Sequence, residues 1–257
     1  MEKKLWSREE LILAFNLYLQ IPFGQIDKSN PKIIELAGLL GRTPGSVAMR
    51  LANFVTCDPF HQNRGVVGLK GGIKQCQPIW DEFAQNRDAL LYESESILAK
   101  WQRTTIEQKY SNLLGDLSGL KGEEKARTVM TRVNQNTFRS IVLANYTNHC
   151  AISGIDVPDL LLASHILPWA ESSPEERLDP ENGICLSALY DRAFDKGLIG
   201  IKQNYEVVLS QELKLKKENE YFRCYFLPVE GLKLRLPQKY LPRKEFLQYH
   251  WDKIYRK

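Results

Sequence analysis

Residues 161–197 read LLASHILPWAESSPEERLDPENGICLSALYDRAFDKG and decide the fold of the C-terminal half of the chain. The stretch begins with the apolar run 160–166, which has the length of a short buried strand. Residues 170–181 are polar and read as a surface loop, and Gly183–Leu186 reads as a second short strand. Residues 187–196 have the spacing of a helix. The order strand, loop, strand, helix predicts a hairpin that is capped by a helix.

Four polar side chains of this stretch suit catalysis. His165 lies at the end of the first predicted strand, and Asn182 lies at the end of the loop. A neutral imidazole accepts a proton from water near neutral pH, so His165 is the natural general base. The Asn182 amide can tie the loop down or fix the orientation of the imidazole. Asp191 and Asp195 are four residues apart and therefore share one face of the predicted helix.

The two aspartates predict a metal ion. Neighbouring carboxylates repel each other unless a cation lies between them, and hard oxygen ligands favour Mg²⁺ or Mn²⁺. A pair of this kind on its own reads more simply as a solvated helix face, with Arg192 and Lys196 as its neighbours. The histidine and asparagine that precede the pair favour the metal site, with one divalent ion.

At this point the sequence resembles the HNH endonuclease family and its ββα-metal fold. The resemblance covers roughly residues 130–257 and rests on the segments Cys150–Gly154, Ser164–Pro168, Asn182-Gly183 and Leu189–Gly197. In that family the first histidine activates water, the asparagine orders the loop, and helix residues nine and thirteen positions after the asparagine ligate the metal. Those two positions are Asp191 and Asp195 in this chain.

The chain also departs from the family pattern. The family's metal ligand just before the first histidine is replaced by Ser164, so this contact would pass to water or backbone, and Asp191 suits Mg²⁺ better than Zn²⁺. Many relatives carry paired Cys-x-x-Cys zinc knuckles. Here no such pair occurs among the five cysteines, at positions 57, 76, 150, 185 and 224. We therefore expect no structural zinc.

The resemblance implies a metal-dependent DNA endonuclease that hydrolyses phosphodiester bonds, with a role in bacterial restriction or antiviral defence. Its partner would be double-stranded DNA, and a homodimer would supply the two active sites that a double-strand break needs. Two alternatives stay open. The first is a DNA-binding regulator with an inactive core, which fits Ser164 in place of a metal ligand. The second is an RNase or toxin on the same core, because the site recognises only a phosphodiester.

Residues 1–100 read as a helical module. Helix-start signals occur at Ser7, at Asn30-Pro31 and at Thr43-Pro44, and Gly41 ends the second helix. The second and third helices are therefore expected to form a helix-turn-helix. The predicted fold class is α+β.

The third predicted helix offers three polar side chains to a DNA groove, those of Ser46, Arg50 and Asn53. A module that binds a protein partner or packs on the nuclease core is the competing interpretation. Residues 101–129 are expected to form a helical linker before a nuclease domain at 130–257. Arg139 and Arg192 are candidates to hold phosphates of the DNA backbone.

Composition sets the remaining limits. The chain has 257 residues, 26% of them charged and 43% hydrophobic, and a formal net charge of +4. This charge permits nucleic-acid binding without requiring it. No apolar run approaches the roughly 18 residues of a membrane span, and no apolar signal core follows the N-terminal charges. The sequence thus predicts a cytoplasmic protein that does not contact a membrane.

Overall fold

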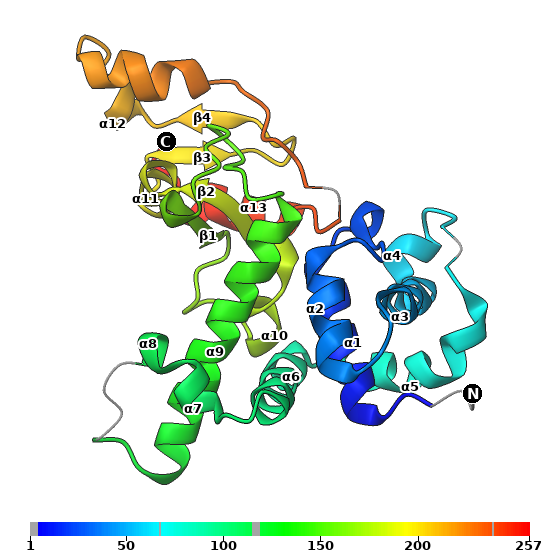
Figure 1. Ribbon diagram of the computed structural model, residues 1–257. Helices are drawn as coiled ribbons and strands as arrows, with labels where there is room; N and C mark the ends of the chain where they lie inside the picture. Colours follow the sequence, from blue (N-terminus) through cyan, green and yellow to red (C-terminus); the bar gives the residue numbers. More distant parts are fainter. Residues whose placement is uncertain (1–4, 67, 115–118, 238) are drawn as a thin grey trace. The chain divides into compact units, whose positions relative to one another are not determined.

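The computed structural model describes residues 5–66, 68–114, 119–237 and 239–257 (Figure 1). The chain forms two compact units, Met1–Thr137 and Phe138–Lys257, which we call the N-terminal and C-terminal units. The division between them falls within helix α9 (Gly122–Asn145). The N-terminal unit is helical, whereas the C-terminal unit combines helices with two small antiparallel sheets, so the predicted α+β class is confirmed.

The N-terminal unit is built on helices that start where their capping residues stand. The side chains of Ser7, Asn30 and Thr43 each accept a hydrogen bond from a backbone N–H of the first helical turn. The Phe15 and Phe54 rings stack in the core with centroids 4.8 Å apart. The helices are α1 (Arg8–Gln20), α2 (Pro31–Leu40), α3 (Pro44–Cys57), α4 (Pro59–Gln62), α5 (Ile73–Phe83) and α6 (Arg87–Trp101).

The segment expected to be a linker has a small core of its own. Its helices α7 (Ile106–Lys109) and α8 (Ser111–Leu114) are followed by α9. Buried side chains of these helices pack into one cluster, made of Ile106, Tyr110, Leu114, Val129 and Val133. The sequence predicts a break in this helical segment between Leu113 and Gly122, and residues 115–118 of that interval lie outside the described residues.

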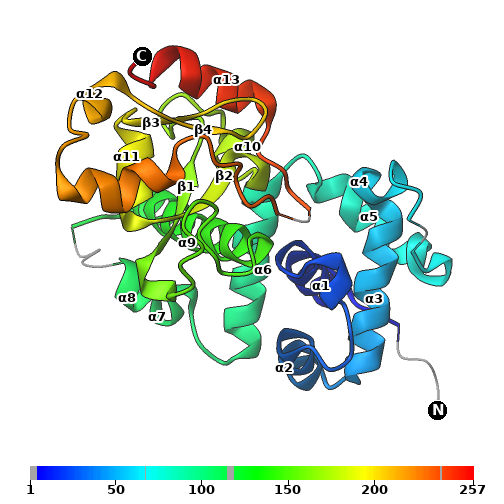
Figure 2. The ribbon, with the colours of Figure 1, turned by 90° about the horizontal axis from the view of Figure 1, so that it is seen from above.

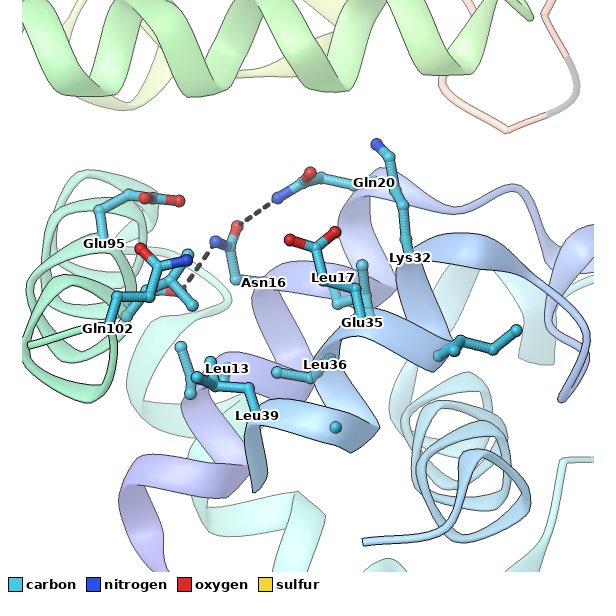
Figure 3. Close-up of a pocket in the computed structure, with 14 residues that line it drawn as sticks. Leu13, Asn16, Leu17, Gln20, Lys32, Glu35, Leu36, Leu39, Glu95 and Gln102 are labelled. Carbon is cyan, nitrogen blue, oxygen red and sulfur yellow. Dashed lines mark hydrogen bonds between the residues drawn. The ribbon is translucent and has the colours of Figure 1, made fainter. Parts of the chain in front are cut away.

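A cavity of about 480 Å³ lies between α1, α2 and α6 of the N-terminal unit (Figure 3). Leucine side chains form much of its wall. Two side-chain amides that line it are joined by a hydrogen bond, in which Gln20 Nε2 donates to Asn16 Oδ1 at 3.3 Å. Asn16 Nδ2 in turn donates to Ser94 Oγ at 2.8 Å. The Glu95 carboxylate at its edge accepts from Lys109 Nζ at 2.7 Å, so this charge is compensated.

The C-terminal unit contains the predicted hairpin and helix. Strand β1 (Leu161–His165) pairs antiparallel with β2 (Gly183–Ser187), with α10 (Pro174–Arg177) in the loop between them. Helix α11 (Ala188–Asp195) follows β2 directly, and the C-terminal half of α9 lies against the hairpin (Figure 2). The predicted order strand, loop, strand, helix is confirmed.

The remaining elements of the C-terminal unit follow α11. Strand β3 (Ile199–Ile201) pairs with β4 (Val207–Leu209), and α12 (Gln211–Lys214) and α13 (Lys244–Lys253) come later. Alternating apolar residues at 232–236 predict a further strand, and this prediction is wrong: the structure shows only an isolated bridge there, between Glu206 and Lys233. Two backbone hydrogen bonds flank this bridge, from Leu234 N to the Tyr205 carbonyl oxygen at 2.9 Å and from Val207 N to the Leu232 carbonyl oxygen at 2.8 Å.

Helix α13 packs on α11 through a buried histidine. The His250 ring stacks on the Phe194 ring with centroids 3.7 Å apart, and His250 Nε2 donates to the Phe194 carbonyl oxygen at 3.0 Å. Burial lowers the pKa of His250 from 6.5 to about 4. The interior of the C-terminal unit therefore holds a neutral imidazole at pH 7.

This histidine predicts acid sensitivity. In the unfolded chain His250 takes up a proton near pH 6.5, whereas in the folded chain it does so only near pH 4. The unfolded state binds more protons in this window, so the stability that is present above pH 6.5 should be lost as the pH falls, by about 3 kcal/mol in total. The free energy of unfolding, measured with denaturant at several pH values in this range, should vary less with pH for His250→Gln than for the wild type. Glutamine keeps a hydrogen-bond donor but does not titrate. His149→Gln serves as the control, and identical profiles for all three proteins would contradict the assignment.

No helix among the described residues is both long enough and apolar enough to cross a membrane.

Candidate active site

His165 is the last residue of β1, and its neighbours on β2 and α9 fix its position. Its partner across the ladder is Gly183, and a Cβ at that position would come within 2.4 Å of Val142 and 3.0 Å of Phe138. Glycine therefore allows α9 to approach the hairpin closely. The Phe138 ring stacks on the His165 ring, with centroids 4.5 Å apart and planes 15° apart. This contact fixes the plane of the imidazole.

A backbone carbonyl sets the tautomer of His165. Nε2 lies 2.8 Å from the carbonyl oxygen of Arg177, which can only accept, so Nε2 carries the proton. The lone pair is then on Nδ1, to which no hydrogen bond runs from any described residue. Burial lowers the pKa of His165 below its ordinary value, while the Arg177 carbonyl and the charge of Asp195 act in the opposite direction. The arrangement favours a neutral imidazole with a free lone pair, which is the form of a general base.

Asn182 ties the loop between the strands to the end of β1. Its side chain is fully buried, Oδ1 accepts from Leu167 N at 2.8 Å, and Nδ2 donates to the Glu176 carbonyl oxygen at 2.9 Å. The next carbonyl along the chain, that of Arg177, accepts from His165. Asn182 and His165 thus bind consecutive peptide carbonyls, and the asparagine helps to place the group that orients the imidazole.

We expect Asn182→Ala to destabilise the C-terminal unit by about 2–4 kcal/mol, because it leaves buried backbone groups without their partners. Denaturant unfolding measures this loss. Asn182→Asp should retain the acceptor toward Leu167 but lose the donor toward Glu176, and should fall between the wild type and the alanine variant. Asn219→Ala, at an exposed position of the same unit, is the matched control. Equal stability of Asn182→Ala and the wild type would refute the role of the asparagine.

Helix α11 brings its two aspartates to the same site as β1. Burial raises the pKa of Asp191, and the Asp195 carboxylate raises it further, while the nearby Ser164 hydroxyl and Arg192 lower it. Ser164 Oγ is buried and has no hydrogen-bond partner among the described residues.

These oxygen atoms fit a hard divalent cation. The Asp195 carboxylate raises the pKa of Asp191, and the Ser164 hydroxyl beside them is buried without a partner among the described residues, so a positive charge among these oxygen atoms would stabilise them. The described residues contain no group of three or more His, Cys, Asp or Glu side chains that could hold a metal ion. Mg²⁺ is commonly bound through one or two carboxylates, with water and substrate phosphate completing its shell. The pair Asp191 and Asp195 matches that pattern, with Ser164 beside it.

The hairpin, α11 and β3 lie within the segment 150–202, which matches the family model of the HNH endonucleases. These residues form an HNH endonuclease domain. No curated protein matches the chain. Members of the HNH family act on nucleic acid, generally with a divalent metal ion, and the site described above lies wholly inside the matched segment.

The HNH domain also contains anchors that the sequence did not reveal. Cys150 Sγ accepts a hydrogen bond from the backbone N–H of Ser187, the N-cap of α11, at 3.2 Å. At the other side of the helix, Tyr190 OH donates to the Tyr225 carbonyl oxygen at 2.6 Å. Together with Arg177 and Phe138, these residues fix the positions of α11 and His165. Their roles depend on contacts between distant segments; Cys150 and Tyr190 carried a signal, through their places in the segments that resemble the family.

The two arginines predicted to hold phosphates have different environments. Arg139 donates to the carbonyl oxygens of Leu161 at 2.6 Å and Pro158 at 3.2 Å, so it fastens the start of β1 to α9. Arg192 is exposed on α11, beside the aspartates of the HNH domain. Of the two, Arg192 has the guanidinium that is open to a substrate phosphate.

The residues predicted to face a DNA groove lie in the N-terminal unit, and two of them are buried. Arg50 donates to Gln75 Oε1 at 2.9 Å and lies over the Trp6 ring at 4.9 Å. Asn53 Nδ2 donates to the Leu69 carbonyl oxygen at 2.6 Å. Arg50 thus holds α5 against α3, and Asn53 holds the segment between α4 and α5 against α3. Ser46 is half-buried near the start of α3. DNA contact by these residues stays a prediction, and for Arg50 and Asn53 it requires release of these bonds.

Arg50→Ala should therefore act mainly on stability. We expect the N-terminal unit to lose about 2–3 kcal/mol, because the guanidinium hydrogen bonds and the contact with Trp6 disappear. Lys74→Ala removes a nearby exposed cation and is the control. The free energy of unfolding is measured with denaturant, and DNA affinity is measured for the same variants over a salt series. A variant with unchanged stability and a salt slope about one unit smaller would instead make Arg50 a phosphate contact.

Proposed function

We propose that this protein is a DNA endonuclease that hydrolyses phosphodiester bonds at the HNH site with Mg²⁺ or Mn²⁺, and that it serves bacterial restriction or antiviral defence. The observation that carries the proposal is the free Nδ1 lone pair of His165 in one site with Asp191 and Asp195. A base for water and a place for a cation are the two requirements of metal-assisted phosphodiester hydrolysis.

In the proposed mechanism, His165 Nδ1 accepts a proton from the attacking water. The Arg177 carbonyl stabilises the resulting imidazolium through the Nε2–H bond, and Phe138 keeps the ring in place. Asp191 and Asp195 would hold the cation, and exposed Arg192 would hold a neighbouring phosphate. The bound ion would supply stabilisation of negative charge on the scissile phosphate and on the departing oxygen.

We further propose that the N-terminal unit recognises the DNA. Helices α2 and α3 are joined by a short turn at Gly41, whose φ of 61° ends α2, and this supports a helix-turn-helix. The exposed part of α3 includes Met49, at 59% exposure, whereas Arg50 is buried. Sequence selectivity would then come from side chains other than Arg50 and Asn53.

One experiment tests the proposed activity. Purified protein is incubated with supercoiled plasmid, linear duplex DNA and RNA, each with Mg²⁺, Mn²⁺ or EDTA. We expect nicking or linearisation of plasmid with either ion and none with EDTA. Cleavage of RNA alone would make the protein an RNase. DNA binding without cleavage under all ion conditions would make it a DNA-binding regulator with an inactive HNH core.

A further inference from the structure

The loop between β1 and β2 carries an arginine whose guanidinium is held in place but not paired with an acid. Arg177 is the last residue of α10 and is half-buried. Its Nε donates to the Trp169 carbonyl oxygen at 3.0 Å, and its guanidinium lies over the Trp169 ring, 5.1 Å from the centroid. No described residue accepts a hydrogen bond from Nη1 or Nη2, and no described carboxylate forms an ion pair with Arg177.

The missing ion pair is informative because the same loop is rich in acids. Four of its carboxylates bond to residues other than Arg177, and these are Glu175, Glu176, Asp179 and Glu181. Ser173 donates to the first two, and Arg243 pairs with the other two at 2.6 and 3.0 Å. An arginine that served only to hold the loop would pair with one of these carboxylates. The outer edge of the Arg177 guanidinium is instead available to an anion from outside the chain.

Both supports of this guanidinium touch the candidate base. The carbonyl oxygen of Arg177 lies 2.8 Å from His165 Nε2. The Trp169 ring meets the His165 ring edge-on, with centroids 5.6 Å apart. The guanidinium is therefore separated from the imidazole by a single aromatic ring, and it belongs to the surroundings of the candidate active site.

The shape of the guanidinium selects the occupant. Trp169 uses Nε and one face of the group, so the edge with Nη1 and Nη2 remains for an anion. This edge carries two parallel N–H bonds, which match two oxygen atoms of one phosphate. Because Trp169 already restricts the side chain, little further conformational entropy is lost when a phosphate binds. A phosphate of the cleaved strand is the anion that reaches His165 in the proposed reaction.

We propose that Arg177 binds a phosphate of the substrate strand next to the cleaved bond, through Nη1 and Nη2, and that Trp169 positions it. Arg177 would then act twice: its carbonyl oxygen orients His165, and its guanidinium holds the strand. This inference rests on the proposed function, because it takes the anion to be a phosphate of the nucleic acid that the HNH site cleaves.

The test separates binding from cleavage. Full-length protein is titrated, in EDTA, into a fluorescein-labelled DNA duplex over a salt series. Arg177→Ala should weaken binding by about tenfold at low salt and lower the salt slope by about one unit. With Mn²⁺ the KM for DNA should rise while kcat changes little, because alanine keeps the backbone carbonyl that orients His165. Arg256→Ala removes an exposed arginine of the same unit, which pairs with Glu212, and should match the wild type throughout.

Three further variants test the fork and its support. Arg177→Lys keeps the charge without the planar fork, so it should retain the salt slope and bind with intermediate affinity. Trp169→Phe keeps a ring and should bind nearly as the wild type does, whereas Trp169→Leu should bind as weakly as Arg177→Ala. Combining Trp169→Leu with Arg177→Ala should cost no more than Arg177→Ala alone, because both changes remove the same phosphate contact.

The proposal is overturned if the wild type does not bind the duplex, or if folded Arg177→Ala binds with the affinity and salt slope of the wild type. A fall in kcat at unchanged affinity would also overturn it, since Arg177 would then only orient His165. Salt-dependent binding that requires Arg177, without cleavage in Mg²⁺ or Mn²⁺, would remove the proposed function and keep the phosphate contact. Cleavage with an affinity that does not depend on Arg177 would do the reverse.

Discussion

Replacing His165 with alanine should lower the rate of DNA cleavage by about 10²–10⁴-fold, the usual cost of losing a general base. The structure identifies the nitrogen that would act as the base. The Arg177 carbonyl oxygen binds His165 at Nε2, so Nδ1 would receive the proton. The two aspartates of α11 are untouched by this change. DNA affinity measured in EDTA should therefore stay close to that of the wild type, and plasmid nicking with Mn²⁺ gives the rate.

His149→Ala is the matched control, since this histidine lies in the same unit and its Nδ1 bonds to the Thr147 carbonyl oxygen at 2.6 Å. It should cleave at the wild-type rate. Circular dichroism checks that both variants are folded. A folded His165→Ala protein that nicks plasmid as fast as the wild type would show that another group activates the water.

Asp191→Asn and Asp195→Asn should each weaken binding of Mn²⁺ and lower cleavage by about 10²-fold or more, because an anionic ligand becomes neutral. The structure adds a prediction for the metal-free protein. The pKa of Asp191 is raised by burial and by Asp195, so its ionised form is less favourable in the folded chain than in the unfolded chain. In EDTA, Asp191→Asn should therefore unfold at the same temperature as the wild type or a higher one.

The two effects are separated by thermal unfolding with and without the ion. Mn²⁺ should raise the unfolding temperature of the wild type and raise that of either asparagine variant much less. Asp156→Asn changes an exposed carboxylate of the same unit and should respond to Mn²⁺ as the wild type does. Calorimetry that shows equal Mn²⁺ affinity in the wild type and both aspartate variants would exclude these residues as ligands.

The HNH domain could be predicted from the sequence because its signals are local. Apolar runs, Asn182 at the loop end and the four-residue spacing of Asp191 and Asp195 lie within one stretch of chain. The structure shows both strands and the helix within about a residue or two of their expected bounds. Whether these residues bind a metal and cleave DNA stays a prediction.

Capping signals located the first helices but did not tell which side of α3 faces the interior. The caps at Ser7, Asn30 and Thr43 depend on hydrogen bonds within a few residues, and all three are confirmed. The outward position of Arg50 was inferred from its polarity alone. In the structure its guanidinium is satisfied inside the unit by Gln75, a residue of the next long helix, and no local pattern could indicate that partner.

The sequence alone thus determines the strands and the helix of the 161–197 stretch and nominates the side chains that would act as base and ligands, because these depend on short-range spacing and residue chemistry. The tertiary structure decides the tautomer, the orientation and the position of those side chains. The tautomer of His165 depends on the Arg177 carbonyl, its ring plane on Phe138, and the position of α11 on Cys150 and Tyr225. Each of these contacts joins segments that are brought together only when α9, the hairpin and the C-terminal turns pack against one another.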